Sequence, residues 1–324
     1  MSRLTVAELR PNTQLNKAPF LLASLDPATD RNGSPYLKMT LRDKTGDIEA
    51  RYWRVPDGVA ERIKTGFGVL VSGQVTEYKG LIQIGVTDIQ PGELDNPEDF
   101  LPIARRPREE MLDELQKLIS SIKNPHLKAL LKEVLSEGDF QRQFLVAAAA
   151  KTYHHACVGG LLEHSLDVVK LMLTEVRRYP EIDRDLGATV ALLHDVGKVE
   201  SYAFGGDFDM TDAGKLLGHI YMGAARIERA IDRIEGFPPE LKLRVLHAIL
   251  AHHGDLDKGS PVTPRTPEAI ALHYADNLDG SLRGWFDYVK TQGSTAAWTL
   301  RSPMHGDELF VGSDPTLKLR ENPQ

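Results

Sequence analysis

The first ninety residues of the chain alternate apolar and polar side chains over short runs. Residues 36–41 place every second side chain on an apolar face, and residues 48–53 continue the pattern beyond turn-forming residues at 43–47. A period of two is typical of a strand with one buried face. Similar short runs occur at 20–25, 69–75 and 81–86. Five short strands separated by turn residues predict a small all-β barrel.

The rest of the chain changes to a helical pattern after a segment rich in proline and charge at 91–107. Apolar side chains then recur every three or four residues, which predicts helices at 111–122, 126–135, 161–176, 186–196, 212–235, 239–252 and 266–289. We therefore predict a multi-domain protein. It has an OB-like barrel over residues 1–92, a linker over 93–110, an all-α domain over 111–295 and a C-terminal tail over 296–324.

Composition narrows the class of protein. A hydrophobic fraction of 41% and a charged fraction of 26% over 324 residues are typical of an ordinary globular protein. No apolar run is long enough for a membrane helix, and the first residues lack the apolar core of a signal peptide. The single cysteine, Cys157, fits a reducing compartment, so we expect a cytoplasmic protein without a membrane partner.

Charge is uneven along the chain. Residues 1–95 hold equal numbers of basic and acidic side chains, so the whole net charge of −7 falls in residues 96–324. This excludes a generally basic nucleic-acid-binding protein, while a locally basic groove stays compatible with the count.

The helical half carries histidines and aspartates within or at the end of apolar runs. His194 and Asp195 end one such run, and Gly197 after them fits the residue that follows a helix C-terminus. The other members of the set are His164, His219, His252, His253 and Asp276. Imidazole and carboxylate groups together are what a metal-dependent phosphoesterase needs.

Each of these residues also has an ordinary structural explanation. A buried histidine is more often a hydrogen-bonded core residue, and Asp276 could pair with His273 one helical turn away. Two adjacent histidines point about 100° apart on a helix, so His252 and His253 converge only where the helix frays. The metal-site hypothesis rests on the set as a whole rather than on any one member.

The order of these residues and their flanking sequences resemble the HD-domain metal-dependent phosphohydrolases, in their two-metal variant. Over roughly residues 15–290 the chain resembles the YhaM-type 3′→5′ exoribonucleases. The matching stretches are 153–165, 191–198, 216–220, 251–254 and 273–279.

The resemblance implies a metal-ligand set and catalytic roles. One divalent ion would be held by His164, His194, Asp195 and Asp276, and a second by Asp195 as a bridge with His219, His252 and His253. Mn²⁺ is the expected ion, with Fe, Co, Ni, Zn and Mg as alternatives. Lys198 would meet a phosphate oxygen, although a solvated lysine is an equal alternative. His155, with His154, would contact the substrate or protonate the leaving oxygen.

An OB-like barrel binds single strands by stacking bases on aromatic side chains beside basic ones. The candidates for stacking are Tyr36, Tyr52, Trp53 and Tyr78, and those for phosphate contacts are Lys38, Arg42, Arg51 and Lys79. Aromatic side chains on strands are core residues at least as often as ligand contacts.

These features lead to three functional hypotheses. The first is a metal-dependent 3′→5′ exonuclease acting on single-stranded RNA and also on DNA. The second is a phosphohydrolase of small nucleotides or cyclic nucleotides. The third is a non-enzymatic RNA-binding protein with a structural metal. A homo-oligomer is compatible with all three.

Overall fold

The computed structural model describes residues 4–30, 32–78, 81–93, 99–135, 138–151, 155–202, 210–292 and 297–313, without the side chains of 291 and 292. The chain forms two compact units. The first contains Met1–Arg105, Cys157–Gly159 and Glu200–Leu216, and the second contains Arg106–Ala156, Gly160–Val199 and Leu217–Gln324.

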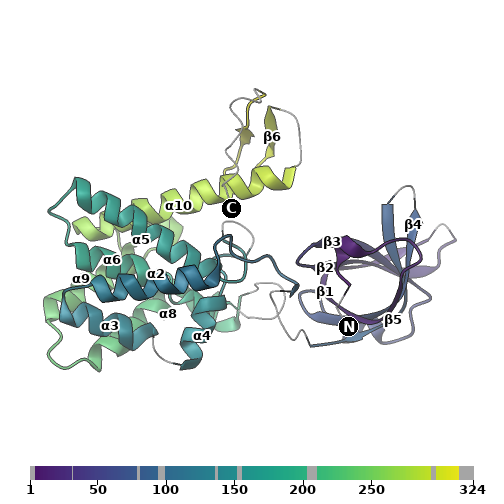
Figure 1. Ribbon diagram of the computed structural model, residues 1–324, viewed down its shortest axis with the longest axis horizontal. Coiled ribbons are helices and arrows are strands. Elements are labelled where there is room, and N and C mark those ends of the chain that lie inside the picture. The colour runs from purple at the N-terminus through teal and green to yellow at the C-terminus, as the bar shows by residue number, and fades with distance from the viewer. Residues whose placement is uncertain are drawn as a thin grey trace. The chain divides into compact units, whose positions relative to one another are not determined.

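Five strands of the first unit close into a barrel with the order β1-β2-β3-β5-β4 (Figure 1). They are β1 (Gln14–Thr29), β2 (Pro35–Asp43), β3 (Gly46–Trp53), β4 (Gly68–Tyr78) and β5 (Leu81–Pro91), with the short helices η1 (Val6–Glu8) and α1 (Val59–Arg62) beside them. Strands β2 and β3 pair antiparallel, whereas β3 and β5 pair in parallel. All five strands lie where the alternation predicts them.

The alternation decides which side chains fill the barrel. Leu37, Met39 and Leu41 of β2 are buried, as are Ile48 and Ala50 of β3. The side chains between them point outward, and the register pairs each outward residue of β2 with an outward residue of β3. The barrel therefore has an apolar interior and a polar outer face on these two strands.

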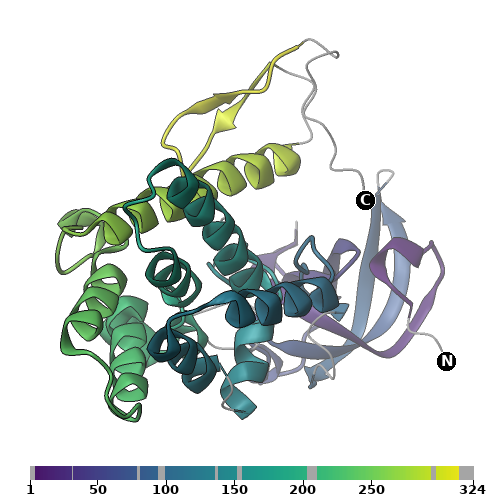
Figure 2. The same ribbon diagram turned by 60° about the vertical axis from the view of Figure 1, so that its left-hand side comes forward.

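Helices form the second unit around a central helix, α6 (Arg184–Leu193), which is buried beyond its first two residues. Every residue of α6 from Leu186 to its end is buried, and α6 contacts helices α3, α5, α9 and α10 (Figure 2). A helix that is apolar all round belongs inside a helical domain. The helices around it are α2 (Arg108–Ser121), α3 (Pro125–Leu135), α4 (Gly138–Val146), α5 (Gly160–Arg178), α8 (Asp212–Asp232), α9 (Pro239–Ala251) and α10 (Pro267–Gln292).

Several short elements differ from the prediction. Helices α4, α7 (Lys198–Ser201) and η3 (Leu256–Lys258) were not predicted, and α6 ends at Leu193 rather than at 196. We predicted no structure after residue 295, but β6 (Trp298–Arg301) and β7 (Glu308–Phe310) pair there as an antiparallel hairpin. Over the residues described, no helix has the length and apolar character needed to cross a membrane.

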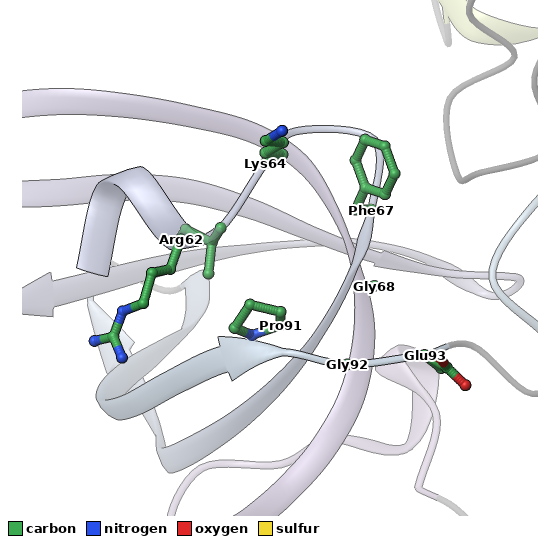
Figure 3. Close-up of a pocket in the computed structure, with 8 residues that line it drawn as sticks. Arg62, Lys64, Phe67, Gly68, Pro91, Gly92 and Glu93 are labelled. Atoms are coloured by element: carbon green, nitrogen blue, oxygen red, sulfur yellow. The ribbon is translucent and has the colours of Figure 1, made fainter. Parts of the chain in front are cut away.

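A pocket of about 280 Å³ opens in the barrel unit (Figure 3). It lies between the α1–β4 connection and the end of β5. None of the predicted site residues lines it; its lining residues are Arg62, Ile63, Lys64, Phe67, Gly68, Pro91, Gly92 and Glu93.

Candidate metal centre

Helix α6 delivers His194 and Asp195 to the interior of the helical unit. His194 is the C-cap of α6, with φ −55° and ψ −39°, and its Nδ1 donates a hydrogen bond to the carbonyl oxygen of Ala191 at 2.8 Å. This hydrogen bond keeps a proton on Nδ1, so Nε2 is the nitrogen that faces the other ligand atoms and would bind an ion. Both His194 and Asp195 are at most 1% exposed.

Helix α9 ends in the same way. His252 is its C-cap, and Nδ1 of His252 donates to the carbonyl oxygen of Ile249 at 2.7 Å. His253 lies beyond the helix, and its Nδ1 donates to the carbonyl oxygen of Lys258 at 2.8 Å. His252 keeps helical dihedral angles of φ −64° and ψ −27°, whereas His253 follows the end of the helix. Their ligand atoms and that of His219 all lie within 4.8 Å of one another.

Gly254 makes this ending possible. Its φ is +84°, a conformation that favours glycine, and an added Cβ would lie 2.3 Å from Cε1 of His273. Nδ1 of His273 donates to the carbonyl oxygen of His252 at 3.0 Å. His273 therefore supports the end of α9 instead of pairing with Asp276, the alternative considered from the sequence.

Gly197 brings the end of α6 against α8. A Cβ on Gly197 would lie 2.1 Å from the carbonyl oxygen of His219 and 2.5 Å from the backbone nitrogen of Gly223. Only glycine permits this approach. Gly197 has no left-handed φ, so it is not the helix-terminating glycine that the sequence suggested. Gly218, with φ +75°, breaks α8 immediately before His219.

The first group of ligand atoms contains two imidazole nitrogens and two carboxylate oxygens. Nε2 of His164 lies 3.1 Å from Nε2 of His194, 3.4 Å from Oδ2 of Asp195 and 3.2 Å from Oδ1 of Asp276. Nε2 of His194 lies 3.3 Å from Oδ2 of Asp195 and 3.6 Å from Oδ1 of Asp276. Helices α5 and α10 supply His164 and Asp276, and the end of α6 supplies the other two.

The second group faces the other oxygen of Asp195. Oδ1 of Asp195 lies 3.3 Å from Nε2 of His219 and 3.6 Å from Nε2 of His252. Among the described residues, these three buried atoms have no hydrogen-bond partner. Buried polar atoms without a partner are rare because each loses hydration without compensation.

Both groups suit divalent cations. Their ring nitrogens and carboxylate oxygens converge as lone-pair donors, and a cation would satisfy all of them at once. Such a donor set is typical of Mn, Fe, Co, Ni and Zn sites. The hydrogen bonds from the Nδ1 atoms of His194, His252 and His253 to backbone carbonyls are typical of metal-binding histidines.

The pKa values of the histidines in the first group are shifted because their side chains are buried close to carboxylates. Burial lowers the pKa of His164, but hydrogen bonds to Asp195, Asp276 and Asp279 outweigh it and hold that pKa well above its usual value. Burial likewise lowers the pKa of His194, and Asp195 and Asp276 raise it to a net value of about 9. In the second group burial is the largest cause and holds the pKa of His219 well below its usual value.

The predicted catalytic residues occupy buried positions. Nζ of Lys198 lies 2.5 Å from Oδ2 of Asp195, so its ammonium offsets the charge of that carboxylate. The phosphate contact predicted for Lys198 stays a prediction. His155 is 2% exposed and hydrogen-bonds through both ring nitrogens to Glu163 and Asp279. His154 lies outside the described residues.

The outer face of the barrel carries most of the predicted nucleic-acid contacts. The rings of Tyr36 and Trp53 stack with centroids 4.3 Å apart, and Trp53 is 45% exposed. Lys38 and Arg51 are the next outward pair in the β2–β3 register, and the guanidinium of Arg51 lies 5.9 Å from the centre of the Tyr78 ring.

Tyr52 does not belong to this face. It is 5% exposed inside the barrel, and its hydroxyl donates to the carbonyl oxygen of Thr87, so the predicted stacking role for Tyr52 is wrong. Arg42 forms an ion pair with Asp47. Lys79 lies outside the described residues.

Two residues near the first group had no predicted role. Asp279 accepts a hydrogen bond from Nδ1 of His164 at 2.7 Å, and Glu163 contacts His155. Asp279 follows Asp276 by three residues on α10 and therefore shares its helix face, which is the signal that could have identified it. Glu163 offers no comparable signal beyond its position next to His164.

Comparisons with known proteins agree with both halves of the chain. The HD domain family profile matches residues 161–281, and the profile of an OB-fold nucleic acid binding domain matches residues 22–91. The 3′-5′ exoribonuclease YhaM of Geobacillus sp. (strain WCH70) is 33% identical over 250 residues, which cover 76% of each chain. The chain belongs to the YhaM family of 3′-5′ exoribonucleases.

Membership of the YhaM family confirms the resemblance inferred from the sequence, and the predicted OB barrel followed by an all-α HD domain is confirmed as well. Two solved structures are similar to the barrel, both domains of replication protein A from Methanococcus maripaludis. The second OB-fold domain, solved in solution, is 22% identical, covers 29% of this chain and 95% of its own, and has a TM-score of 0.22. A crystal structure is 23% identical, covers 28% and 94%, and has a TM-score of 0.23. These TM-scores are too low to carry a conclusion.

Proposed function

We propose that this protein is a metal-dependent 3′→5′ exonuclease that hydrolyses phosphodiester bonds of single-stranded RNA, and also of single-stranded DNA. The observation that carries the proposal is the convergence of six ligand side chains around Asp195 in a member of the YhaM family. The exposed Tyr36–Trp53 stack on an OB barrel supports a single-stranded substrate.

The two groups of ligand atoms define how this chain would hold two divalent ions. His164, His194, Asp195 and Asp276 would hold one, and Asp195, His219, His252 and His253 the other. Bound divalent ions would supply a nucleophile at neutral pH and offset charge on the phosphate. We propose manganese as the ion, and the histidine nitrogen and carboxylate oxygen donors are compatible with it as they are with Fe, Co, Ni and Zn.

The protein's own side chains have separate tasks in this proposal. Asp195 offers one oxygen to each group, so its replacement disturbs both. Lys198 balances the charge of Asp195 and would contact a phosphate oxygen of the substrate. On the barrel, Tyr36, Trp53 and Tyr78 would stack bases while Lys38 and Arg51 contact phosphates. With a single cysteine, we place the protein in the cytoplasm.

The test is a ladder assay on a 5′-labelled oligoribonucleotide in the presence of Mn²⁺. We expect products that shorten one nucleotide at a time from the 3′ end, and no shortening when the 3′ end is blocked. Asp195→Asn should remove the activity, whereas Glu268→Gln, a buried carboxylate elsewhere on α10 that pairs with Arg244, should retain it. No degradation with Mn²⁺, Mg²⁺, Co²⁺ or Fe²⁺ would refute the proposal. Turnover of mononucleotides or cyclic nucleotides without RNA degradation would favour the small-nucleotide hypothesis.

A further inference from the structure

His155 lies in the middle of a buried series of hydrogen bonds that ends on His164. Its Nδ1 lies 3.0 Å from Oε2 of Glu163, and its Nε2 lies 3.0 Å from Oδ2 of Asp279. The same oxygen of Asp279 accepts from Nδ1 of His164 at 2.7 Å. The His155 side chain is 0% exposed, and that of Glu163 is 2% exposed. The series therefore runs from Glu163 through His155 and Asp279 to a candidate metal ligand.

These contacts fix the orientation of both imidazole rings. His155 meets a carboxylate oxygen at each ring nitrogen, so its ring cannot turn without breaking one of the two hydrogen bonds. Nδ1 of His164 donates to Oδ2 of Asp279, which directs Nε2 of His164 toward the atoms of Asp195 and Asp276. Asp279 therefore determines which nitrogen of His164 faces the candidate metal centre.

The series also ties together the two helices that supply this ligand pair. Glu163 and His164 are neighbours on α5, whereas Asp276 and Asp279 lie one turn apart on α10. By contacting one carboxylate from each helix, His155 bridges α5 to α10. The separation of Nε2 of His164 from Oδ1 of Asp276, 3.2 Å, depends on that spacing.

The backbone of His155 is held in a costly conformation to make these contacts. Its φ is +54°, in the left-handed region that residues other than glycine rarely adopt. Its carbonyl oxygen accepts from the backbone nitrogen of Ala149 at 3.2 Å. Such strain is retained where the surrounding structure requires one side-chain position.

We propose that His155 is a positioning residue that acts through Asp279 to orient His164 toward a divalent ion. This role replaces the one predicted from the sequence, since both ring nitrogens already hydrogen-bond to carboxylates and the side chain is closed to solvent. The inference rests on the proposed function only for the kind of ion that His164 binds. It holds for any reaction that the centre performs.

The test measures metal binding directly, using the full chain freed of metal. Mn²⁺ titration followed by electron paramagnetic resonance gives the affinity of each site, and the visible spectrum of the Co²⁺-loaded protein reports ligand geometry. His155→Gln should weaken one Mn²⁺ site about 10- to 100-fold, the range for residues that support a metal ligand, and should alter the Co²⁺ spectrum. The double variant with Asp279→Asn should bind no more weakly than the worse single variant, because both residues act through one series.

The matched control is Glu268→Gln, which changes a buried carboxylate on the same helix away from this series. It should leave Mn²⁺ affinity and the Co²⁺ spectrum unchanged. If His155→Gln fails to fold, Glu163→Gln removes the first carboxylate of the hydrogen-bond series while keeping His155. This variant should weaken Mn²⁺ binding as well, but by a smaller factor. Thermal unfolding of the metal-free variants separates these outcomes from loss of structure.

Two results would overturn the proposal. If His155→Gln binds Mn²⁺ like the unchanged protein but degrades RNA at a much lower kcat, His155 acts on the substrate. If His155→Gln and Glu268→Gln weaken Mn²⁺ binding equally, His155 has a general structural role. A third outcome distinguishes the two proposals. If the parent protein degrades no RNA but His155→Gln still binds Mn²⁺ more weakly than the parent, the proposed exonuclease function is refuted and this inference is supported.

Discussion

Replacing Gly197 with alanine should separate α8 from the end of α6 and so disrupt the second group of ligands. The added Cβ would lie 2.1 Å from the carbonyl oxygen of His219 and 2.5 Å from the backbone nitrogen of Gly223. Carbon–heavy-atom contacts are comfortable only at about 3.5 Å, so relief requires a movement of roughly 1 Å. The 3.3 Å separation between His219 and Asp195 would lengthen by a similar amount.

From this movement we expect a loss of about 1–3 kcal/mol in the free energy of unfolding, as for other overpacked positions. A misplacement of roughly 1 Å in a catalytic centre costs about 100-fold in rate, and we expect that loss in the ladder assay. Urea denaturation of the metal-free protein measures the first quantity and Mn²⁺ titration follows the second group directly.

Gly223→Ala is the matched control on the opposite side of the same contact. Its Cβ would lie 3.1 Å from the backbone nitrogen of Gly197, with the next atoms at 3.5 and 3.6 Å, so a shift of a few tenths of an ångström suffices. Alanine also favours the helix by roughly 0.5–1 kcal/mol, which offsets the strain. If Gly197→Ala matched Gly223→Ala in stability, Mn²⁺ affinity and activity, the contact at Gly197 would not hold the centre together.

Three further predictions follow from other parts of the structure. Trp53→Ala should weaken binding of a single-stranded oligoribonucleotide by about 1–3 kcal/mol, measured by fluorescence anisotropy at fixed salt. Tyr52→Phe loses only the hydrogen bond to Thr87 and should bind the oligoribonucleotide normally. Equal losses in the two variants would contradict the conclusion that Trp53 lies on the outer face of the barrel and Tyr52 inside it. The pKa of His194 is raised to about 9, so its proton competes with a metal ion for the ring nitrogen. The affinity for Mn²⁺ should therefore rise about tenfold per pH unit between pH 6 and 8 for each proton that the ion displaces. A potentiometric titration that detects no proton release on Mn²⁺ binding would disprove this. Burial raises the pKa of Glu175 from 4.5 to about 7, so the folded state binds its proton more tightly than the unfolded state and stability falls as pH rises from 4.5 to 7. Thermal unfolding should show Glu175→Gln to be about 1 kcal/mol more stable than the parent at pH 8 and no more stable at pH 4. This magnitude is reduced from the full pKa shift because the side chain is partly exposed.

The barrel was predictable because strand periodicity is local information. Strands β2 and β3 show their buried face in their own residues, whereas β1 buries Phe20, Leu21 and Leu22 in succession. The alternation along β3 could also have excluded Tyr52 as a nucleic-acid contact. Tyr52 lies on the inward face of β3 with Ile48 and Ala50, whereas Arg51 and Trp53 lie on the outward face. Aromatic character alone was the wrong criterion there.

The sequence allowed the ligand residues of the metal centre to be predicted, but not the backbone contacts that hold them in place. The seven ligand residues named from the sequence lie together in the structure. The close approach at Gly197 depends on α8, a separate helix, so no local pattern reveals it. The hairpin of β6 and β7 was missed because its strands are only four and three residues long, too short for a periodic pattern.

The matching ends of α6 and α9 have a consequence for the order in which the centre fills. Each helix directs its C-terminus at the ligand groups, and each contributes roughly half a negative charge from its macrodipole there. In the metal-free centre, the ammonium of Lys198 and the raised pKa values of His164 and His194 offset the negative charge of Asp195, Asp276 and these helix ends. A divalent ion that displaces the histidine protons brings more positive charge than they do, so we expect cations to load before a nucleic-acid strand enters.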